Sequence, residues 1–508
     1  MNYSMYLCFV VATLGRKDST REPSPASEVE NTIAPALQLL LQSLREFASK
    51  PISPQAAFDL EQQVQAHLRE LGRVGIEWAY NHVEPSQTDP LPAHVEFEEA
   101  GLYTRLKRKT PQDVATSFGK IRLWRVGYRP THKTGEPTIF PLAQQLGIVA
   151  SATPALAERA ARYQAEAGAT QRRTLQRLKH EHGVDWGVKK LRQVTSRVAD
   201  AMAEHRHEVQ VEKLLQLLEQ AWASTGKHKP VLSIGRDGIA FGVPIRGGTI
   251  FEVASAGTVT VLDRRGKRLG TVYLACMPES KQATMSAQLT RLVKEVLQRW
   301  ERPLPRLCYV TDAGDNETTY YQKVLRRMRH PRTEEKLTWI RVVDYYHASE
   351  RLWKMAEALF GKRPAARAWA RRMQKLLKKP NGIKRVLNSA AALRSRHELK
   401  GKRQQEFGKA YHYLRVRTKS MRYATYKRVG IPCGSGVTEA ACKTIYTQRL
   451  KLSGMRWKKA GAQTILNLRV LLLSGVWTEA CQRVLNKFEN VKVPTYDIPK
   501  GESLKMAA

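Results

Sequence analysis

The sequence predicts an α/β fold in which a mixed sheet is covered by helices and is flanked by mostly helical regions. Two observations support this prediction, and a third concerns the partner. Short apolar runs typical of strands gather between residues 229 and 347, first in succession and then alternating with amphipathic helices. Helical spacing of apolar residues dominates near the N-terminus and again from residue 348 to residue 430. Finally, the net charge is +39, so the surface is strongly basic.

The composition restricts the class of protein and its partners. A chain of 508 residues exceeds one ordinary core, so we expect about two to four domains. Its 85 basic and 46 acidic residues leave a self-repelling charge, which indicates a polyanionic partner; nucleic acid is the usual one and an anionic membrane is the rival. No apolar run approaches membrane length, and Tyr3–Leu14 is too short to span a bilayer.

The cysteines indicate a reducing compartment. They are scattered and form no CxxC pair, which argues against a structural zinc site and a disulfide framework. We therefore expect an intracellular protein without zinc. The six residues are Cys8, Cys276, Cys308, Cys433, Cys442 and Cys481.

The N-terminal part is expected to be helical. Residues 1–29 carry Pro and Ser and are predicted to be disordered. Residues 30–115 are predicted to form an N-terminal helical region, because Ile33–Phe47 and Phe58–Trp78 place apolar residues at helical spacing. The simplest interpretation is an amphipathic pair of helices that packs on another element, and we assign no function to it.

Residues 116–225 are predicted to form a DNA-binding region. After a short strand or hairpin in Thr116–Tyr128, a helix over Gln171–His180, a turn and a second helix from Val188 fit a helix-turn-helix. The outer face of the second helix is basic and would suit a major groove; it carries Lys189, Lys190 and Arg192. The alternative is an ordinary helical hairpin with solvated lysines.

Residues 229–347 are predicted to form the first part of the α/β core. Helices are expected over Thr284–Trp300 and Thr318–Met328. The strands are expected at Pro230–Ile234, Thr249–Val253, Val259–Leu262, Leu269–Cys276, Leu307–Thr311 and Leu337–Val343. This order, a meander followed by alternating helices and strands, is typical of a mixed sheet covered by helices.

Residues 348–430 are predicted to form a basic, all-helical insertion. Strand patterns vanish here, and residues 351–430 contain 24 Lys and Arg against 3 Glu. Such an excess is unlike the mixed charge of an ordinary solvated helix. Because Trp and Tyr are interleaved with the basic residues, the segment suits contact with a nucleic-acid backbone together with base stacking.

Residues 431–488 are predicted to return the chain to the core. Glu439 stands alone among basic residues, just after Gly434, Ser435 and Gly436. It would either begin a helix capped by Thr438 or bind a metal beside a phosphate-binding surface, and the two roles are compatible. The basic residues that follow are Lys443, Arg449, Lys451, Arg456, Lys458 and Lys459. Residues 489–508 are expected to be a loop-like tail.

Two aspartates are candidates to join Glu439. Asp237 and Asp312 each follow an apolar run that is expected to be a strand, and ligand groups gather at strand ends in α/β sheets. Clustered carboxylates repel one another unless a cation lies among them, and Mg²⁺ is the natural one. Two such ions would activate a water or a 3′-hydroxyl for phosphoryl transfer. A single Asp at a strand end is more often a turn or cap residue.

The C-terminal motif resembles a known family. The run Gly434-Ser-Gly-Val-Thr-Glu-Ala-Ala-Cys-Lys, continuing through Leu452-Ser-Gly-Met-Arg-Trp and Gly461-Ala-Gln-Thr-Ile-Leu-Asn-Leu-Arg469, is similar to the signature of bacterial insertion-sequence transposases of the Kra type. These belong to the Mutator-like DDE transposases. The resemblance extends over most of the chain after Val29. It implies a ribonuclease-H-like catalytic core that is interrupted by the helical insertion.

The resemblance also implies the site residues. The family's DDE triad corresponds to Asp237, Asp312 and Glu439, with Asp315 and Glu317 as rivals for the second position. Asp344-Tyr-Tyr-His347 matches an Asp-x-x-His element of the related group, and His347 is expected to position DNA or brace the core rather than bind metal. Some relatives carry a cysteine zinc knuckle that has no counterpart here, so no zinc is expected.

The resulting hypothesis is a DNA transposase. It would cleave the ends of an insertion sequence and join them to target DNA with Mg²⁺, or Mn²⁺ in its place. Its partner would be DNA and not a membrane, and it would form a homo-oligomer on DNA in the bacterial cytoplasm, associated with the nucleoid. The alternatives are a catalytically inactive, element-encoded DNA-binding protein and a ribonuclease-H-like nuclease that only hydrolyses.

Overall fold

The computed structural model describes residues 25–85, 88, 91–97, 101–131, 135–486 and 495–496, which divide into two compact units. The first unit contains the described residues up to Leu156, together with Arg177–Trp186 and residues 495–496. The second contains Ala157–Gln176 and the described residues from Gly187 to 486. All three carboxylates predicted to form the catalytic site, Asp237, Asp312 and Glu439, belong to this second unit. The division falls inside the region 116–225, which we expected to be one domain.

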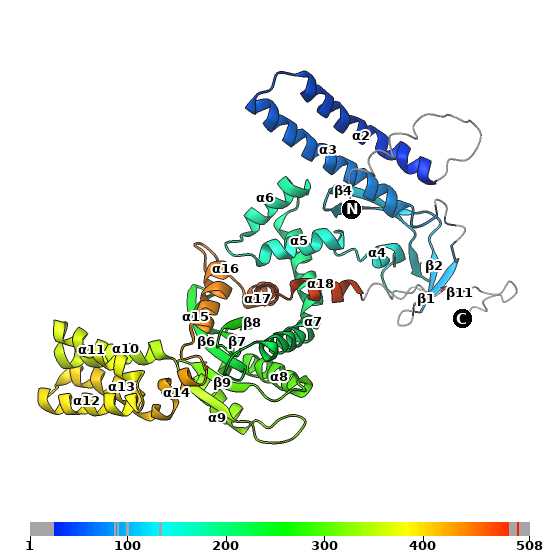
Figure 1. Ribbon diagram of the computed structural model, residues 1–508. Coiled ribbons are helices and arrows are strands. Elements are labelled where there is room, and N and C mark those ends of the chain that lie inside the picture. The colour runs from blue at the N-terminus through cyan, green and yellow to red at the C-terminus, as the bar shows by residue number, and fades with distance from the viewer. Residues whose placement is uncertain are drawn as a thin grey trace, which may run out of the picture. The chain divides into compact units, whose positions relative to one another are not determined.

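Two long helices begin the first unit. α2 (Pro25–Ser49) and α3 (Pro54–Asn81) form a hairpin (Figure 1), and Ser53 caps α3 by accepting an amide of its first turn. Both predicted helices are confirmed. The expected disorder is wrong for residues 25–29, because Pro25 fits the first turn of a helix and Glu28 interacts favourably with its dipole. Residues 1–24 lie outside the described residues.

Strands follow the hairpin in the first unit. One sheet has the order β11-β1-β2-β5, and a separate antiparallel pair is formed by β3 and β4. The region 30–115 is therefore not wholly helical, and its strands bury Val95, Tyr103 and Val114. The bounds are β1 (His94–Phe97), β2 (Gly101–Arg105), β3 (Thr110–Thr116), β4 (Gly119–Arg125), β5 (Tyr128–Pro130), β11 (Thr495–Tyr496) and α4 (Pro141–Gln145).

A five-stranded mixed sheet forms the centre of the second unit. Its order is β10-β9-β6-β7-β8, with β9 parallel to β6 and β10, and β7 antiparallel to its neighbours. The predicted mixed α/β architecture is confirmed. The strands are β6 (Val231–Ile245), β7 (Gly248–Leu262), β8 (Arg268–Cys276), β9 (Arg306–Thr311) and β10 (Trp339–Val343).

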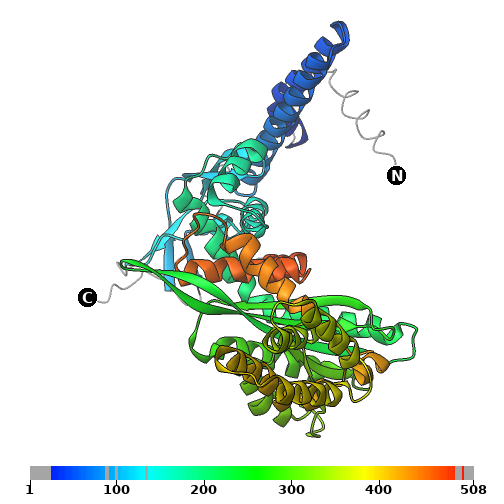
Figure 2. The same ribbon diagram turned by 90° about the vertical axis from the view of Figure 1, so that its left-hand side faces the viewer.

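The first two strands are longer than predicted. β6 and β7 each run for 15 residues, and the predicted Thr249–Val253 and Val259–Leu262 belong to one strand. The pairing of β6 with β9 ends at Gly235, and that of β7 with β8 ends at Ser255, opposite Gly238. From Ile239 and Ala254 outward, β6 and β7 continue as a two-stranded ribbon, drawn in green in Figure 2. Glycines and Pro244 in this ribbon lower its strand propensity, but the register with β7 continues to Ile245.

Helices cover both faces of the sheet. Because successive strand residues point to opposite faces, Leu232 packs on one side with α7 (Val188–Ala223) and α8 (Ala283–Arg299), while Val231 packs on the other with α10 (Tyr345–Phe360). The other helices that contribute to this unit are α5 (Pro154–Ala165), α9 (Asp315–Lys323), α15 (Gly436–Cys442), α16 (Gln448–Leu450), α17 (Lys459–Leu473) and α18 (Trp477–Asn486).

Residues 345–428 form a run of helices, here called the helical segment, as expected for residues 348–430. They lie together on the left of Figure 1 and share one core with β9 and β10. Their bounds are α10, α11 (Pro364–Leu377), α12 (Gly382–His397), α13 (Gly401–Val416) and α14 (Tyr423–Arg428). Trp369 and Phe407 are buried inside this core, and the partly buried Trp353 packs against it. The expectation that tryptophans of this segment stack on bases is wrong for Trp369, because its buried ring holds the helices together.

The predicted helix-turn-helix is present as two helices. α6 (Gln171–His182) and α7 are separated by residues 183–187, and Lys189 and Arg192 are exposed while Lys190 is half-buried. However, α7 runs for 36 residues, and its second half supplies Leu214 and Leu218 to the core beneath the sheet. The helix thus has a structural role that a short recognition helix does not have.

The edge strand β10 is held by tyrosines of α14. The Tyr423 hydroxyl donates to the Val343 carbonyl at 2.8 Å, and the Tyr426 hydroxyl donates to the Arg341 carbonyl at 3.2 Å. Burial raises the pKa of both phenols, so they remain protonated donors at neutral pH. Carbonyl groups on the unpaired side of the strand therefore obtain partners without a further strand.

Replacing Tyr423 by Phe should lower the free energy of unfolding by about 1–3 kcal/mol, because the buried Val343 carbonyl would lose its donor. The midpoint of urea denaturation measures this change. Tyr346→Phe is the control, since Tyr346 is 66% exposed and its hydroxyl can bond to water. Equal midpoints for the two variants would show that the bond to β10 contributes nothing.

Candidate active site

Asp237 and Asp312 lie at the same edge of the sheet. Asp237 is inside β6 and not at its end, which corrects the prediction, but it lies just past Gly235, where β6 stops pairing with β9. Asp312 directly follows the last residue of β9. Because β6 and β9 are parallel, the two carboxylates come together where their pairing ends. The Asp237 carboxylate accepts the Gly238 amide at 2.7 Å.

Glu439 is brought to this edge by α15. The Thr438 hydroxyl lies 2.8 Å from the hydroxyl of Thr258 on β7, and the Cys442 thiol lies 3.5 Å from an oxygen of Asp237. Residues three apart share one face of a helix, so Glu439 lies on the face that meets Asp237. Thr438 is not the N-cap that we expected. The N-cap position of α15 is Ser435 instead, and Thr438 lies inside the helix, where its side chain is buried against the sheet.

The close approach of α15 requires a glycine on β6. A Cβ at Gly235 would lie 1.9 Å from the Thr438 hydroxyl oxygen and 2.6 Å from that of Thr258. Any side chain at Gly235 would therefore push α15 away from the sheet. The five residues after α15, Lys443–Thr447, form a π-helical turn. Such turns interrupt α-helices and occur frequently at functional sites.

The loop that carries Asp312 is held by α13. The Tyr413 hydroxyl donates to the Asp312 carbonyl at 2.5 Å, and the Arg417 guanidinium donates to the Ala313 carbonyl at 2.9 Å. Arg417 also lies over the Tyr413 ring, 4.2 Å from its centroid. Ala313 has a φ of 60°, in the left-handed region. Two side chains from the helical segment thus fix a turn that would otherwise be strained.

Glu317 is a fourth carboxylate at the site. It is only 7% exposed, and oxygens of Glu317 and Asp312 both lie within 3.5 Å of the point where a Cβ at Gly314 would stand. Burial, and then the charges of Asp312 and Asp237, raise the pKa of Glu317, while the nearby Arg236 lowers it. Asp315 is exposed in the first turn of α9. Of the two rivals of Asp312, Glu317 is therefore the one that belongs to the cluster.

The electrostatics of the cluster disfavour several negative charges. Burial raises the pKa of Asp237, and the charges of Asp312 and Glu439 raise it further, although hydrogen bonds from Gly238 and Cys442 act in the opposite direction. Oxygen donors that repel one another suit a hard divalent cation. In the part of the chain that the structure describes, no three His, Cys, Asp or Glu side chains stand in an arrangement that could hold a metal ion. The donor chemistry fits Mg²⁺, whereas the side-chain arrangement does not surround one.

Asp344 connects the sheet to the loop before α15. It is fully buried at the end of β10 and caps α10, where one oxygen accepts the His347 amide at 3.1 Å. Its other oxygen accepts the Ser435 hydroxyl at 2.6 Å and the Ser435 amide. Because both of its carboxylate oxygens accept hydrogen bonds, Asp344 acts as a structural anchor. Sequence reasoning missed the role of Ser435, although its position between two glycines indicated a close approach.

Ser435 and His347 both reach Glu439. The Ser435 oxygen lies 3.0 Å from Glu439 Oε1, and His347 Nε2 lies 3.5 Å from the same atom. The single hydroxyl proton of Ser435 cannot serve both Asp344 and Glu439 at once. The contact of Ser435 with Asp344 is the shorter of the two, and the other ring nitrogen of His347, Nδ1, lies 3.3 Å from Glu350 Oε2. His347 therefore lies beside the carboxylates.

Five of the six basic residues predicted to bind DNA near α15 are exposed: Lys443, Lys451, Arg456, Lys458 and Lys459. Among them, Lys459 forms an ion pair with Glu252 at 2.6 Å, and Lys451 donates to the Ala240 carbonyl at 2.9 Å. The prediction is wrong for Arg449, which is 0% exposed and donates to the Gln164 carbonyl at 2.6 Å. Burial lowers the pKa of Arg449 to about 10.

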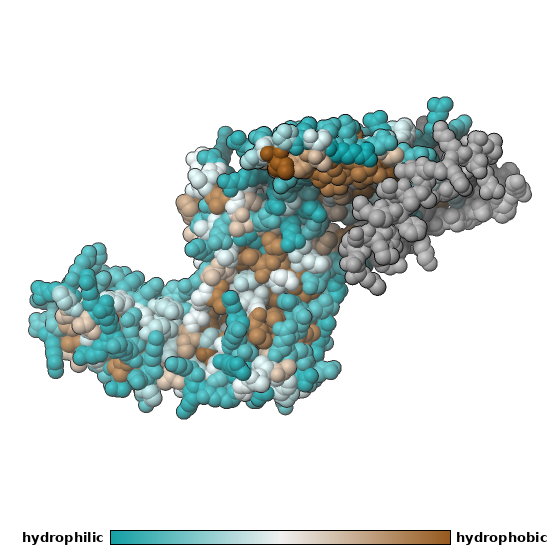
Figure 3. All heavy atoms as spheres, turned by 45° about the horizontal axis from the view of Figure 1, so that its top comes forward, coloured by the Kyte–Doolittle hydropathy of each residue, from teal (hydrophilic) through white to brown (hydrophobic). Residues whose placement is uncertain are grey.

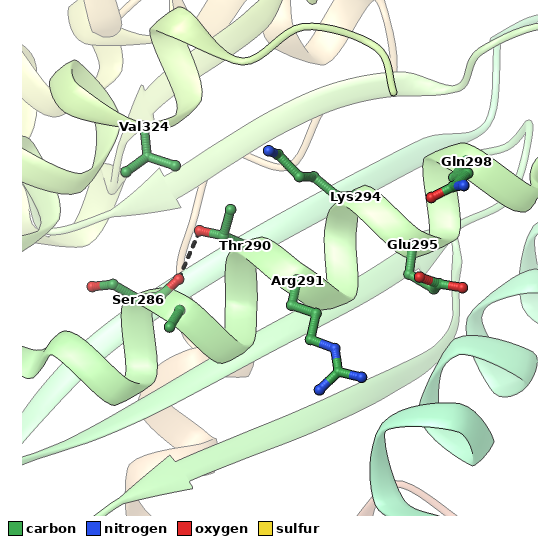
Figure 4. Close-up of a pocket in the computed structure, with 8 residues that line it drawn as sticks. Ser286, Thr290, Arg291, Lys294, Glu295, Gln298 and Val324 are labelled. Carbon is green, nitrogen blue, oxygen red and sulfur yellow. Dashed lines mark hydrogen bonds between the residues drawn. The ribbon is translucent and has the colours of Figure 1, made fainter. Parts of the chain in front are cut away.

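A pocket on α8 lies apart from the carboxylates. Its volume is about 490 Å³, and it is lined by α8 residues and Val324, as Figure 4 shows. The Thr290 hydroxyl donates to the Ser286 carbonyl at 2.7 Å, and the Ser286 hydroxyl accepts from the buried Arg236 at 2.9 Å. Arg236, the neighbour of Asp237 in sequence, thus bonds to a residue that lines the pocket. The carboxylates of the cluster, Asp237, Asp312, Glu317 and Glu439, do not line it.

No protein-family model matches the chain, and no curated protein matches it. Among the described residues, no helix is long and apolar enough to cross a membrane.

Gly235→Ala should lower the free energy of unfolding by about 1–3 kcal/mol, because the added Cβ overlaps the Thr438 hydroxyl. Thermal or urea denaturation measures the loss. Gly436→Ala is the control, since a Cβ there meets no atom within 4 Å. Adding Thr438→Ala to Gly235→Ala should restore part of the stability. A Gly235→Ala variant as stable as the wild type would show that α15 does not approach β6 this closely.

Asp237→Asn should stabilise the fold at pH 7. The pKa of Asp237 is raised in the folded state, so its contribution is most favourable below its unfolded pKa and is lost as the pH rises through the folded pKa. The gain from the amide should therefore be present at neutral pH and disappear under acidic conditions. Thermal midpoints between pH 4 and pH 8 measure it. Asp315→Asn, at an exposed position, should give no such pH-dependent gain. The same profile of thermal midpoints in both variants would contradict the claim that burial and neighbouring charges disfavour the charged form of Asp237.

Proposed function

We propose that this protein is a DNA transposase of the DDE type, with a ribonuclease-H-like core and the helical segment as an insertion in it. One observation carries the proposal: Asp237 on β6, Asp312 after β9 and Glu439 on α15 meet at one edge of a mixed sheet in a chain of net charge +39. The resemblance of the segment from Gly434 to Arg469 to insertion-sequence transposases supports the same assignment. The substrate would be DNA, bound by a homo-oligomer in the bacterial cytoplasm.

The carboxylates would hold divalent cations. Asp237, Asp312 and Glu439 would bind Mg²⁺ or Mn²⁺, which when bound activates a water or a 3′-hydroxyl and stabilises the leaving oxygen. Binding would offset the burial and the charge repulsion that together raise the pKa of Asp237. Because Glu439 is exposed, its side chain can turn toward a bound cation when DNA is present. Glu317, buried beside Asp312, would adjust the charge of the site without reaching the substrate.

The remaining side chains would position these ligands. Tyr413 and Arg417 hold the backbone of the Asp312 turn, and Ser435 with His347 restricts Glu439. Exposed Lys443 and Arg456 follow α15 and would contact backbone phosphates. The joining reaction would then proceed by direct attack of a 3′-hydroxyl on a phosphodiester, with no covalent bond to the protein.

A non-catalytic DNA-binding protein is the second candidate. The observation in its favour is that, among the described residues, the carboxylates do not surround a point where a metal could bind. The positive charge of the chain fits both candidates equally, because DNA binding does not depend on the carboxylates. A hydrolytic nuclease with the same core would differ from a transposase by giving no joined products.

Asp237→Asn and Glu439→Gln should each reduce metal-dependent cleavage by more than about 100-fold, since changes outside the direct ligands alone cost about 10–100-fold. The assay is cleavage and joining of a plasmid that carries the DNA flanking this gene, in Mg²⁺. Both variants should bind that DNA in EDTA as the wild type does.

Asp315→Asn is the matched control for these variants, because it removes an exposed carboxylate close to Asp312 in sequence and should leave cleavage unchanged. Full cleavage by Asp237→Asn and Glu439→Gln would refute the proposed site. Tight binding without cleavage by the wild type would favour the non-catalytic candidate.

A further inference from the structure

Two hollows on the helical segment are lined by positive charge. The first, of about 830 Å³, lies over α11 and α12 and contains Arg372, Lys375, Lys379 and Arg385. The second, of about 610 Å³, lies between the start of α12 and α14. Its basic residues are Lys379, Lys384, Lys419, Arg422 and Arg428. No acidic residue lines either hollow.

The two hollows adjoin each other at a turn of the chain. Lys379 and Pro380, in the turn between α11 and α12, line both of them. The second hollow also includes Gly382, the first residue of the 16-residue α12, so first-turn amides add to its positive field. In Figure 3 this part of the molecule is predominantly teal, which shows a hydrophilic surface over the helices.

These cations are not neutralised within the protein. In the described part of the chain no ion pair joins any of them to a carboxylate, and residues 351–430 contain only three Glu. One of these, Glu406, already faces Lys409 at 3.4 Å. Several like charges around two concave surfaces repel one another, and an anion bound between them would remove the repulsion.

The shape of the surface selects an extended anion. A single phosphate would occupy one hollow, whereas a nucleic-acid strand carries a phosphate on every nucleotide and can occupy both. No aromatic residue lines either hollow, so the hollows offer no ring for base stacking. Recognition here would therefore involve the backbone and not the sequence.

The second hollow is connected to the candidate active site. Thr418, which lines it, directly follows Arg417, the side chain that holds the Asp312 turn. Arg422 and Arg428 flank the tyrosines that hold β10. A strand bound in the hollows would lie on residues adjacent in sequence to those that fix one side of the site.

We propose that these two hollows form a DNA-backbone groove, which binds the sugar–phosphate backbone of duplex DNA without sequence preference. The proposal rests on the proposed function, because it assigns to the DNA substrate a second contact surface outside the carboxylate cluster. It predicts that part of the salt dependence of DNA binding arises from this groove.

The test is the binding of full-length protein to a duplex of arbitrary sequence, measured by fluorescence anisotropy in EDTA over a series of salt concentrations. The groove variant is Lys379→Gln/Lys384→Gln/Arg428→Gln. The control variant, Lys362→Gln/Arg396→Gln/Lys402→Gln, makes the same change in charge at exposed positions of the same segment outside the hollows. Equal thermal midpoints establish that both variants fold.

The groove variant should bind more weakly, and its slope of log affinity against log salt should fall by up to about 2.7, or about 0.9 for each lost phosphate contact. The control variant should retain a slope close to that of the wild type. Equal losses in the two variants would overturn the proposal, since the effect would then come from net charge alone. Competition by inorganic tripolyphosphate as strong as that by the duplex would also overturn it, in favour of a small-anion site.

The outcome is separable from that of the proposed function. Binding in EDTA requires no cleavage, so a wild-type protein that binds through the groove but never cuts DNA would refute the transposase and leave the groove. If the wild-type protein cuts DNA in Mg²⁺ while the groove variant binds like the control variant, the groove is refuted and the transposase proposal stands.

Discussion

The buried carboxylate of Asp344 is the interaction on which the candidate site depends. A fully buried charge is tolerated only when hydrogen bonds replace its water, and here the donors come from two separate parts of the chain. One set begins α10, which opens the helical segment, and the other is Ser435, which precedes α15. The end of β10 and the loop that carries Glu439 are thereby fixed to each other by one side chain.

Further contacts fix the positions of the other two parts of the site, α15 and the turn that carries Asp312. Gly235 lets α15 lie against β6, and the paired hydroxyls of Thr258 and Thr438 fix its height over the sheet. From the other direction, Tyr413 and Arg417 hold the Asp312 turn by its backbone carbonyls. The helical segment is therefore part of the support of the carboxylates, and its positive charge is carried by a structure that the site requires.

Much of the second unit could be predicted from the sequence because its strands and helices have strong periodicity. The mixed sheet and the helices of 345–428 follow from that pattern, and the gathering of Asp237, Asp312 and Glu439 agrees with what the motifs implied. Buried charge was not predictable in the same way. Arg449 looks like any other basic residue in sequence, and only the packing of α5 and α16 shows that it donates to Gln164. The lengths of β6 and β7 were also missed, since glycine and proline inside a ribbon resemble a turn.

Because Glu439 follows the helical segment in the chain, the candidate site can be completed only after that segment has been made. Asp237 and Asp312 leave the ribosome before the helical segment, and Glu439 leaves after it. A nascent or truncated chain that ends within α14 already contains the basic residues of the helical segment but lacks the last carboxylate. Under the proposed function, such a product would bind DNA without cleaving it. The chain order alone would then make truncated copies competitors of copies that contain α15.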